Sequence, residues 1–277
     1  MSDAKTSVIN ERPIGVFDSG VGGLSVLRAI RTELPAEDTL YVADSGHAPY
    51  GDRARTFIEQ RAIAIAEFLE AQGAKAIVVA CNTATGAAVQ ALRARFTMPV
   101  VAMEPAVKPA ALQTKTGTVG VLATTSTLSS QKFLDLVDRH GAGVRVLIQP
   151  CPGLVEQVEA GDLRGPATRA IVERLVRPVL DRGADTLVLG CTHYPFLRQV
   201  IEEVAGDRVA LIDPALAVAR ELRRRLAAAD LLAPESRQGG EAFFTSGRPD
   251  AVAAVMSMLW LTSVAVSPLP ASAATAG

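Results

Sequence analysis

Two segments of this chain, 110 residues apart, follow the same pattern. Residues 73–83 read Gly-Ala-Lys-Ala-Ile-Val-Val-Ala-Cys-Asn-Thr, and residues 183–193 read Gly-Ala-Asp-Thr-Leu-Val-Leu-Gly-Cys-Thr-His. Each segment has a turn, a short apolar run typical of a buried strand, a small residue, and then a cysteine followed by two polar residues. Residues at the point where a parallel strand gives way to a helix lie at the sheet edge where α/β proteins bind ligands. The repeat therefore predicts two cysteines, one from each half of the chain, that face one substrate from opposite sides.

The repeat extends beyond the cysteines. Residues 100–106 (VVAMEPA) resemble residues 209–215 (VALIDPA), and residues 14–17 (IGVF) resemble residues 119–122 (VGVL). Three matches in the same order, at nearly the same offset, indicate two homologous half-units of similar topology.

Short apolar runs alternate with longer segments of helical period, which is typical of βα units and a parallel sheet. Strands are expected at residues 14–17, 40–43, 76–80, 100–103, 118–122, 144–148, 186–190, 209–212 and, more weakly, 241–245. Helices are expected at residues 24–34, 53–71, 84–96, 127–140, 166–182, 196–204 and 216–229. The predicted fold class is α/β, with two pseudo-symmetric α/β half-units, mostly parallel sheets, and the active site in the cleft between them.

The matched segments also predict how the chain divides into domains. Residues 1–103 and 210–277 are assigned to the first α/β domain, and residues 104–209 to the second. The candidate functional residues divide between the two: the first domain carries Asp18 and Cys81, and the second carries Thr124 and Cys191.

Composition limits the classes of function. The net charge of −1 gives no reason to expect a nucleic acid or an acidic membrane surface as the main partner. Residues 1–12 lack a basic segment followed by an apolar run, and residues 256–266 form an apolar stretch too short for a membrane span. We therefore expect a cytoplasmic protein. Residues 268–277 are rich in Ala, Ser and Pro and are expected to be disordered.

The chain has three cysteines, Cys81, Cys151 and Cys191, at wide spacing. Neither a disulfide framework nor the close pairs of a zinc site is present, so the cysteines are expected to be thiols. Buried cysteine often acts only as a small apolar residue. A thiol at a strand–helix junction also lies near the positive end of the helix, which is expected to lower its pKa. A thiol with one histidine suits acyl transfer, whereas two opposed thiols suit proton exchange.

Asp18 and Ser19 follow the first expected strand and lead into a glycine-rich run at residues 20–23. Such a run could bind a phosphate at a helix N-terminus, but it is not GxGxxG and lacks a P-loop lysine. It could equally hold a carboxylate or an ammonium group, with Asp18 facing a positive charge. A capped tight turn is the simpler alternative.

Two more loops follow strands at the same predicted sheet edge. Residues 49–51 (Pro-Tyr-Gly) are typical of a shaped loop over a small pocket, although an ordinary turn is the alternative. The hydroxyls and backbone N–H groups of residues 124–127 (TTST) could bind a carboxylate or simply cap the next helix.

His193 is the histidine adjacent to a candidate catalytic cysteine, and as a cation it could stabilise a thiolate. The role of Glu159 is open from spacing alone, with a solvated helix face as the alternative. His47 is expected at the surface, and neither His140 nor Cys151 has a partner that the sequence indicates.

Together these residues resemble a known family. The segments at residues 17–25 (FDSGVGGLS), 49–51 (PYG), 81–84 (CNTA) and 190–195 (GCTHYP) are similar to those of glutamate racemases, in the cofactor-independent aspartate/glutamate racemase superfamily. The similarity runs in order from about residue 14 to about residue 226.

The resemblance implies an isomerase that interconverts L- and D-glutamate and supplies D-glutamate for peptidoglycan synthesis. It implies that Cys81 exchanges the α-proton on the D face and Cys191 on the L face. Asp18 would assist Cys81, and His193 and Glu159 would assist Cys191. The implied substrate-binding residues are Asp18, Ser19, Pro49, Tyr50, Gly51, Asn82, Thr83, Thr124, Thr127, Thr192 and His193.

We expect no cofactor and no metal, because no lysine follows a matching strand as a pyridoxal Schiff base would require. The expected partner is glutamate, with no membrane and no direct nucleic-acid contact. Family members commonly form homodimers, and some are associated with binding DNA gyrase, which could coexist with catalysis. The alternatives are an aspartate racemase or a decarboxylase of the same superfamily, an amino-acid-binding or partner-inhibiting protein, and a dithiol redox protein.

Overall fold

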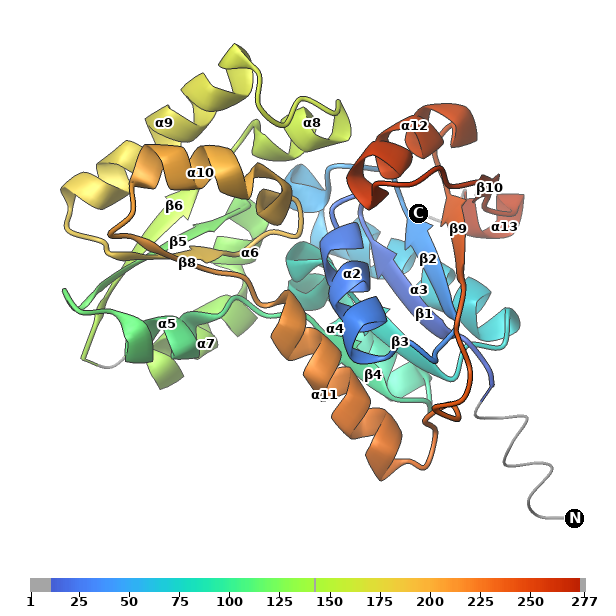
Figure 1. Cartoon of the computed structure of the whole chain (residues 1–277). Coiled ribbons are helices and arrows are strands. Elements are labelled where there is room, and N and C mark those ends of the chain that lie inside the picture. Colours follow the sequence, from blue (N-terminus) through green and yellow to red (C-terminus); the bar gives the residue numbers. More distant parts are fainter. Residues whose placement is uncertain (1–10, 142, 275–277) are drawn as a thin grey trace, which may run out of the picture.

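The computed structural model describes residues 11–141 and 143–274. Figure 1 shows two lobes: the first contains the N-terminal segments together with the C-terminal ones, and the second contains the middle of the chain. Residues 1–10 and 275–277 of the predicted first domain lie outside the described residues.

Each lobe is built on a parallel β-sheet. In the described part of the chain, the first sheet has strand order β10-β9-β2-β1-β3-β4. Its strands are β1 (Ile14–Asp18), β2 (Thr39–Ala43), β3 (Ala76–Val79), β4 (Val100–Ala102), β9 (Glu241–Thr245) and β10 (Val266–Pro268). The second sheet has the order β6-β5-β7-β8. Its strands are β5 (Thr118–Ala123), β6 (Arg145–Pro150), β7 (Thr186–Leu189) and β8 (Ala210–Ile212). Every strand pair is parallel, which confirms the predicted fold class.

The two sheets have the same local topology, as the sequence repeat predicts. β1 lies between β2 and β3, with β4 next to β3, and β5 lies between β6 and β7, with β8 next to β7. Gly15 and Gly120 occupy equivalent positions in β1 and β5, and each allows a covering helix to approach closely, through Leu69 and Val179 respectively. The two halves therefore share strand order and helix packing.

Helices cover both faces of each sheet, because alternate residues of the buried strands point to opposite faces. In the first half, α2 (Leu24–Glu33), α11 (Ala215–Ala228) and α12 (Pro249–Trp260) lie on one face. The other face is covered by α3 (Arg55–Ala71), α4 (Asn82–Arg95) and α13 (Ala271–Ala274). In the second half, α9 (Pro166–Asp181) and α10 (Arg198–Ala205) lie on one face, and α5 (Val107–Gln113), α6 (Thr125–Ser129) and α7 (Gln131–His140) lie on the other. The short elements η1 (Tyr50–Asp52), α8 (Leu154–Glu159) and η2 (Tyr194–Leu197) lie in the loops that lead to the cleft.

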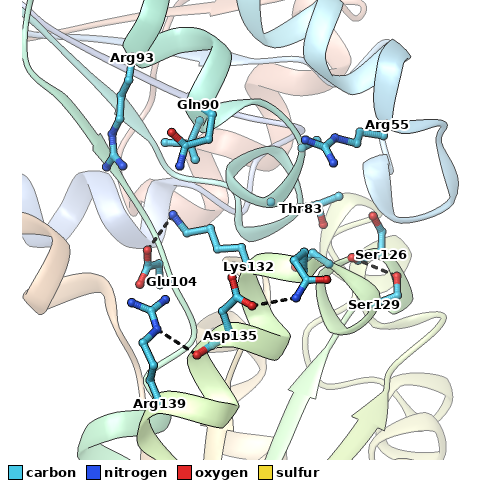
Figure 2. Close-up of a pocket in the computed structure, with 15 residues that line it drawn as sticks. Arg55, Thr83, Gln90, Arg93, Glu104, Ser126, Ser129, Lys132, Asp135 and Arg139 are labelled. Carbon is cyan, nitrogen blue, oxygen red and sulfur yellow. Dashed lines mark hydrogen bonds and ion pairs between the residues drawn. The ribbon is translucent and has the colours of Figure 1, made fainter.

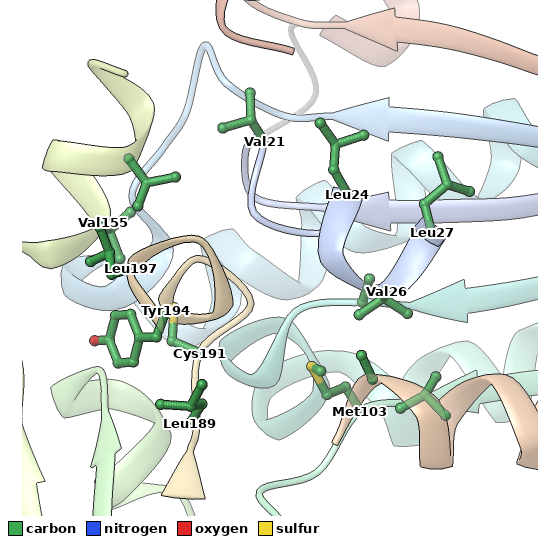
Figure 3. Close-up of a cluster of buried hydrophobic side chains, with 14 of the residues drawn as sticks. Val21, Leu24, Val26, Leu27, Met103, Val155, Leu189, Cys191, Tyr194 and Leu197 are labelled. Atoms are coloured by element: carbon green, nitrogen blue, oxygen red, sulfur yellow. The ribbon is translucent and has the colours of Figure 1, made fainter. Parts of the chain in front are cut away.

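One apolar cluster is continuous across the two halves. It includes Leu24 and Leu27 of α2 and also Tyr194 and Leu197 of η2. Figure 3 shows these side chains on both sides of the junction, with Cys191 beside Tyr194. Packing across the junction buries apolar surface from both halves and so fixes their approach near the cysteine-bearing strand ends.

The structure corrects three predictions. β8 pairs with β7, so residues 210–212 belong to the second sheet, and the chain returns to the first half only afterwards. The helix expected at residues 127–140 is two helices, because Ser130 has extended backbone angles and caps α7. The tail expected to be disordered from residue 268 instead contains α13, after β10 has paired with β9.

Candidate active site

Cys81 lies at the junction between β3 and α4, where its extended backbone leads into the helix. Its sulfur accepts a hydrogen bond from the N–H of Ala84 at 3.4 Å and donates to Ser19 Oγ at 3.7 Å. The side chain is buried in the cleft, as the sequence predicts for this position.

The expectation of a lowered pKa at this junction is wrong for Cys81. Burial and then the nearby Asp18 carboxylate raise the pKa of the Cys81 thiol, and these effects outweigh the Ala84 N–H. A buried thiolate next to a negatively charged carboxylate is disfavoured, so the resting form of Cys81 is the protonated thiol.

Cys191 follows β7 at the equivalent position and begins a chain of polar contacts. Its sulfur lies 3.6 Å from His193 Nδ1, and His193 Nε2 lies 2.7 Å from Glu159 Oε1. Burial alone would lower the pKa of His193, but its hydrogen bonds with Cys191 and Glu159 raise the pKa well above the ordinary value. The histidine is therefore held in its cationic form beside the thiol.

Asp18 links the two halves through its hydrogen bonds. Its Oδ2 accepts hydrogen bonds from the N–H of Gly23 at 2.7 Å and from Thr192 Oγ1 at 3.2 Å. Oδ1 is buried with no hydrogen-bond partner among the described residues. Burial raises the pKa of Asp18, although His193 and the N–H of Gly23 oppose the shift.

The glycine-rich run after β1 is the surface on which the His193–Glu159 pair packs. The N–H of Val21 donates to Glu159 Oε1 at 2.8 Å. A Cβ at Gly20 would clash with the Glu159 carboxylate, and a Cβ at Gly22 would clash with the His193 ring. In this structure the run therefore makes room for side chains of the second half, a role that sequence spacing did not indicate.

Three threonine hydroxyls and one amide line the other side of the cleft. Thr83 Oγ1 lies 2.9 Å from Thr124 Oγ1 and 3.1 Å from Thr127 Oγ1, so the group spans both halves. Neither polar atom of the buried Asn82 amide has a hydrogen-bond partner in the described part of the chain. A buried amide without partners is costly, and a polar ligand in the cleft could satisfy it.

These residues enclose one small cavity. It is lined by Ser19, Pro49, Tyr50, Gly51, Cys81, Asn82, Thr83, Thr124, Thr127, Val155, Gly190, Cys191, Thr192 and His193. Val155 and Gly190 of this lining were not predicted as site residues, because an apolar side chain and a glycine carry no chemical signal in the sequence. The predicted helpers Asp18 and Glu159 lie behind this lining, in contact with Thr192 and His193 respectively.

The cavity volume is about 10 Å³, room for about one water molecule. A ligand the size of an amino acid therefore needs movement of the surrounding residues to enter.

A second, larger cavity of about 600 Å³ lies between α4 and the α6–α7 region. Figure 2 shows Arg93, Lys132 and Arg139 among the charged side chains around it, together with Glu104. It shares Thr83 with the thiol cavity but contains neither cysteine.

Cys151 is not part of the thiol cavity. It is buried in the apolar cluster, its sulfur donates to the Gln149 carbonyl at 3.3 Å, and burial raises the pKa of its thiol to about 12. Among the described residues all three cysteines are free thiols. Within the same residues, no group of three or more His, Cys, Asp or Glu side chains is arranged to hold a metal ion. None of the helices in this part of the chain has the length and apolar character needed to cross a membrane.

Comparison with known sequences places the chain among racemases. Residues 14–222 match the family described as Asp/Glu/hydantoin racemase. The glutamate racemase of Methylococcus capsulatus is 57% identical over 262 residues, which cover 95% of this chain and 97% of that protein. The glutamate racemase of Pseudomonas aeruginosa is 54% identical over 253 residues, which cover 91% of this chain and 95% of that protein.

Solved structures agree with the sequence comparison. A glutamate racemase isoform from Bacillus anthracis superposes with a TM-score of 0.86 at 32% identity, covering 95% of this chain and 99% of that one. The Escherichia coli glutamate racemase, solved with L-glutamate and the activator UDP-MurNAc-Ala, superposes with a TM-score of 0.82 at 32% identity, covering 93% of this chain and 98% of that one. The chain therefore belongs to the Asp/Glu/hydantoin racemase family and is an isomerase, as its sequence motifs predict.

Proposed function

We propose that this enzyme interconverts L- and D-glutamate by moving the α-proton between two thiols, Cys81 and Cys191. The observation that carries the proposal is that two buried thiols, from equivalent strand ends of two similar halves, line one cavity. Racemisation needs a base on one face of the α-carbon and an acid on the other, and the two must exchange roles when the direction reverses. Matched groups from matched halves meet that need.

In the direction from D-glutamate to L-glutamate, the Asp18 carboxylate first accepts the proton of the resting Cys81 thiol, which leaves Cys81 as the thiolate. The Cys81 thiolate removes the α-proton, so that the C–H bond breaks and an S–H bond forms. The Cys191 thiol then delivers its proton to the opposite face of the carbanion and becomes the thiolate. The reverse reaction begins with the Cys191 thiolate and the Cys81 thiol.

The side chains behind each thiol support this assignment. Asp18 lies close enough to influence the Cys81 thiol electrostatically, and the cationic His193 lies beside Cys191 with Glu159 behind it. A cation next to a thiol stabilises the thiolate, whereas a carboxylate favours the protonated thiol. We propose that Asp18 assists Cys81 and that His193 and Glu159 assist Cys191.

The donors around the cavity would hold the substrate. The unpartnered amide of Asn82 and the hydroxyl cluster of Thr83, Thr124 and Thr127 can hydrogen-bond carboxylate and ammonium groups. Donors fixed in a small cavity also stabilise the negative charge that develops when the α-proton leaves. We propose these side chains as substrate-binding residues, together with Ser19, Pro49, Tyr50, Gly51 and Thr192, which also line the cavity.

The names of the relatives support glutamate as the substrate, and aspartate is the alternative. The proposal includes a supply of D-glutamate for peptidoglycan and catalysis without a cofactor. A cytoplasmic location remains a prediction from the sequence, and a homodimer and an interaction with DNA gyrase remain predictions from the family resemblance.

The test is polarimetry of the purified enzyme with L-glutamate, D-glutamate and L-aspartate, without pyridoxal phosphate or added metal. Optical rotation should decay to zero with either glutamate enantiomer. A decay with aspartate alone would transfer the assignment to aspartate racemase. A constant rotation with all three would overturn the proposal in favour of a binding protein.

A further inference from the structure

A buried ion pair lies directly behind the wall of the thiol cavity. Asp44 follows β2, and Arg61 lies on the inner face of α3. Arg61 Nη2 donates to Asp44 Oδ1 at 2.7 Å, and Arg61 Nε donates to Asp44 Oδ2 at 3.0 Å. Neither side chain is exposed to solvent. The two parallel hydrogen bonds fix the carboxylate in one orientation.

The pair holds Tyr50, which lines the cavity. The Tyr50 hydroxyl donates to Asp44 Oδ2 and also contacts the Arg61 guanidinium. Burial raises the pKa of Tyr50 well above its ordinary value, and the neighbouring Asp44 carboxylate raises it further, so the hydroxyl keeps its proton and continues to donate. Since this hydroxyl is occupied by the ion pair, Tyr50 offers the substrate its ring and backbone.

The segment that contains Tyr50 reaches across to the second half. A Cβ built at Gly51 would lie 3.3 Å from the Cβ of Thr124, one of the hydroxyl-bearing residues of the cavity. At its other end, His47 Nδ1 lies 3.1 Å from Asp44 Oδ1. Residues 47–51 are therefore attached to Asp44 at two points and close the cavity against Thr124.

A buried ion pair contributes little to stability by itself, because removing two charges from water opposes folding and apolar packing would avoid that cost. The ion pair instead fixes geometry, because its two parallel hydrogen bonds set the position of each group that it contacts. Asp44 and Arg61 also neutralise each other, so they add no net charge beside a substrate that carries charges of its own.

We propose that Arg61 and Asp44 are positioning residues for substrate binding, which hold Tyr50 and residues 49–51 in the shape that closes over glutamate against Thr124. The proposal rests on the proposed function, since glutamate is the ligand whose binding it explains.

The chain contains a matched control. Lys75 and Glu37 form another buried ion pair in the same half, but they precede β3 and β2 and so lie at the opposite edge of the sheet from the cavity. Arg61→Lys keeps the charge beside Asp44 and loses the two parallel hydrogen bonds. Lys75→Arg makes the reverse charge-conserving exchange in the control pair.

The experiment measures steady-state kinetics, thermal unfolding and amide hydrogen exchange of residues 44–54 in the two variants and the wild type. Arg61→Lys should raise KM for glutamate by about tenfold, the effect of losing one or two net hydrogen bonds, with kcat changed less. Residues 44–54 should exchange faster in that variant. Lys75→Arg should lower Tm while KM and the exchange of this segment stay at their wild-type values.

If Arg61→Lys fails to fold, Tyr50→Phe replaces it, since it keeps the buried ring and removes only the hydroxyl link. A KM and an exchange rate equal to those of the wild type, in whichever variant folds, would overturn the proposal. An equal rise in KM in Lys75→Arg would also overturn it, because the effect would then be general destabilisation. If the wild type itself does not turn over glutamate, the proposed function fails, and the exchange of residues 44–54 still decides whether the pair holds the segment.

Discussion

At the scale of single residues, the three buried thiols have different predicted roles. Cys81→Ala and Cys191→Ala should each lower kcat by about 10²–10⁴-fold or more, the contribution of a positioned acid or base. Cys151→Ala, which removes a thiol from the apolar cluster outside the cavity, should retain turnover. Polarimetry gives the rates, and circular dichroism checks that all three variants fold. Normal turnover by either cavity variant would contradict the two-thiol assignment.

The raised pKa of His193 leads to a prediction about how the free energy of unfolding changes with pH. Its pKa is raised in the folded state by Cys191 and Glu159 despite burial, so the stabilisation from its protonated form is complete below its unfolded pKa of about 6.5. That stabilisation is lost as pH rises through the higher folded pKa. The difference in unfolding free energy between the wild type and His193→Gln should therefore shrink from about pH 6 upwards. Urea unfolding across this range measures it, and a difference that grows with pH would show that the sign is wrong.

At the scale of elements, the loop between β1 and α2 must lack side chains at Gly20 and Gly22, because Glu159 and His193 of the second half pack against it. Gly22→Ala should displace the His193 ring from Cys191 and lower kcat by about 10²-fold, because a small misplacement of a catalytic group is costly. Gly240→Ala is the control, since the nearest atom to its Cβ would be Asp38 Oδ1 at an ordinary 3.9 Å. Kinetics of the two variants, with Tm measured in parallel, separate the catalytic effect from loss of stability. Equal kinetics in both would show that the loop does not set the position of His193.

At the scale of the whole molecule, the thiol cavity between the two halves is small, and we predict that the halves separate to admit substrate in each turnover. Gly51 and Thr124 lie on opposite halves, and a Cβ built at Gly51 would lie 3.3 Å from the Thr124 Cβ, close to the range of about 3.5–4.5 Å found in disulfides. The double variant Gly51→Cys/Thr124→Cys should lose roughly tenfold or more of its activity when oxidised, equivalent to a barrier about 1.4 kcal/mol higher, and recover it on reduction. The same activity in both redox states would mean that substrate enters without separation of the halves.

Much of this architecture could be predicted because the sequence repeats its strand-and-cysteine pattern. The pattern located β3 and β7 and placed Cys81 and Cys191 at equivalent strand ends. The helix after residue 106, α5, was missed because its seven residues are too few for a clear helical period. The boundary at residue 210 was wrong because a short edge strand pairs with whichever sheet it reaches, which apolar residues alone do not reveal.

Other features depend on contacts between distant segments. Arg61 was not predicted, because a buried arginine within a helix is indistinguishable in sequence from an exposed one. The raised pKa of Cys81 depends on burial and on the approach of Asp18, neither of which follows from its position at a helix start. The glycine-rich run is evident in the sequence. The side chains that pack against it belong to residues 159 and 193 of the other half, and the sequence does not show that they meet it.

The most direct test of two-sided proton transfer is deuterium partitioning during turnover in D₂O. D-glutamate is incubated with the wild-type enzyme, and at early conversion the deuterium at the α-carbon is measured separately in the product and in the remaining substrate. Two thiols on opposite faces predict deuterium in the L-glutamate product and little in the D-glutamate that remains, because the proton removed by Cys81 is not the one that Cys191 delivers. Deuterium entering remaining substrate and product at equal early rates, or product that retains the original proton, would contradict the account.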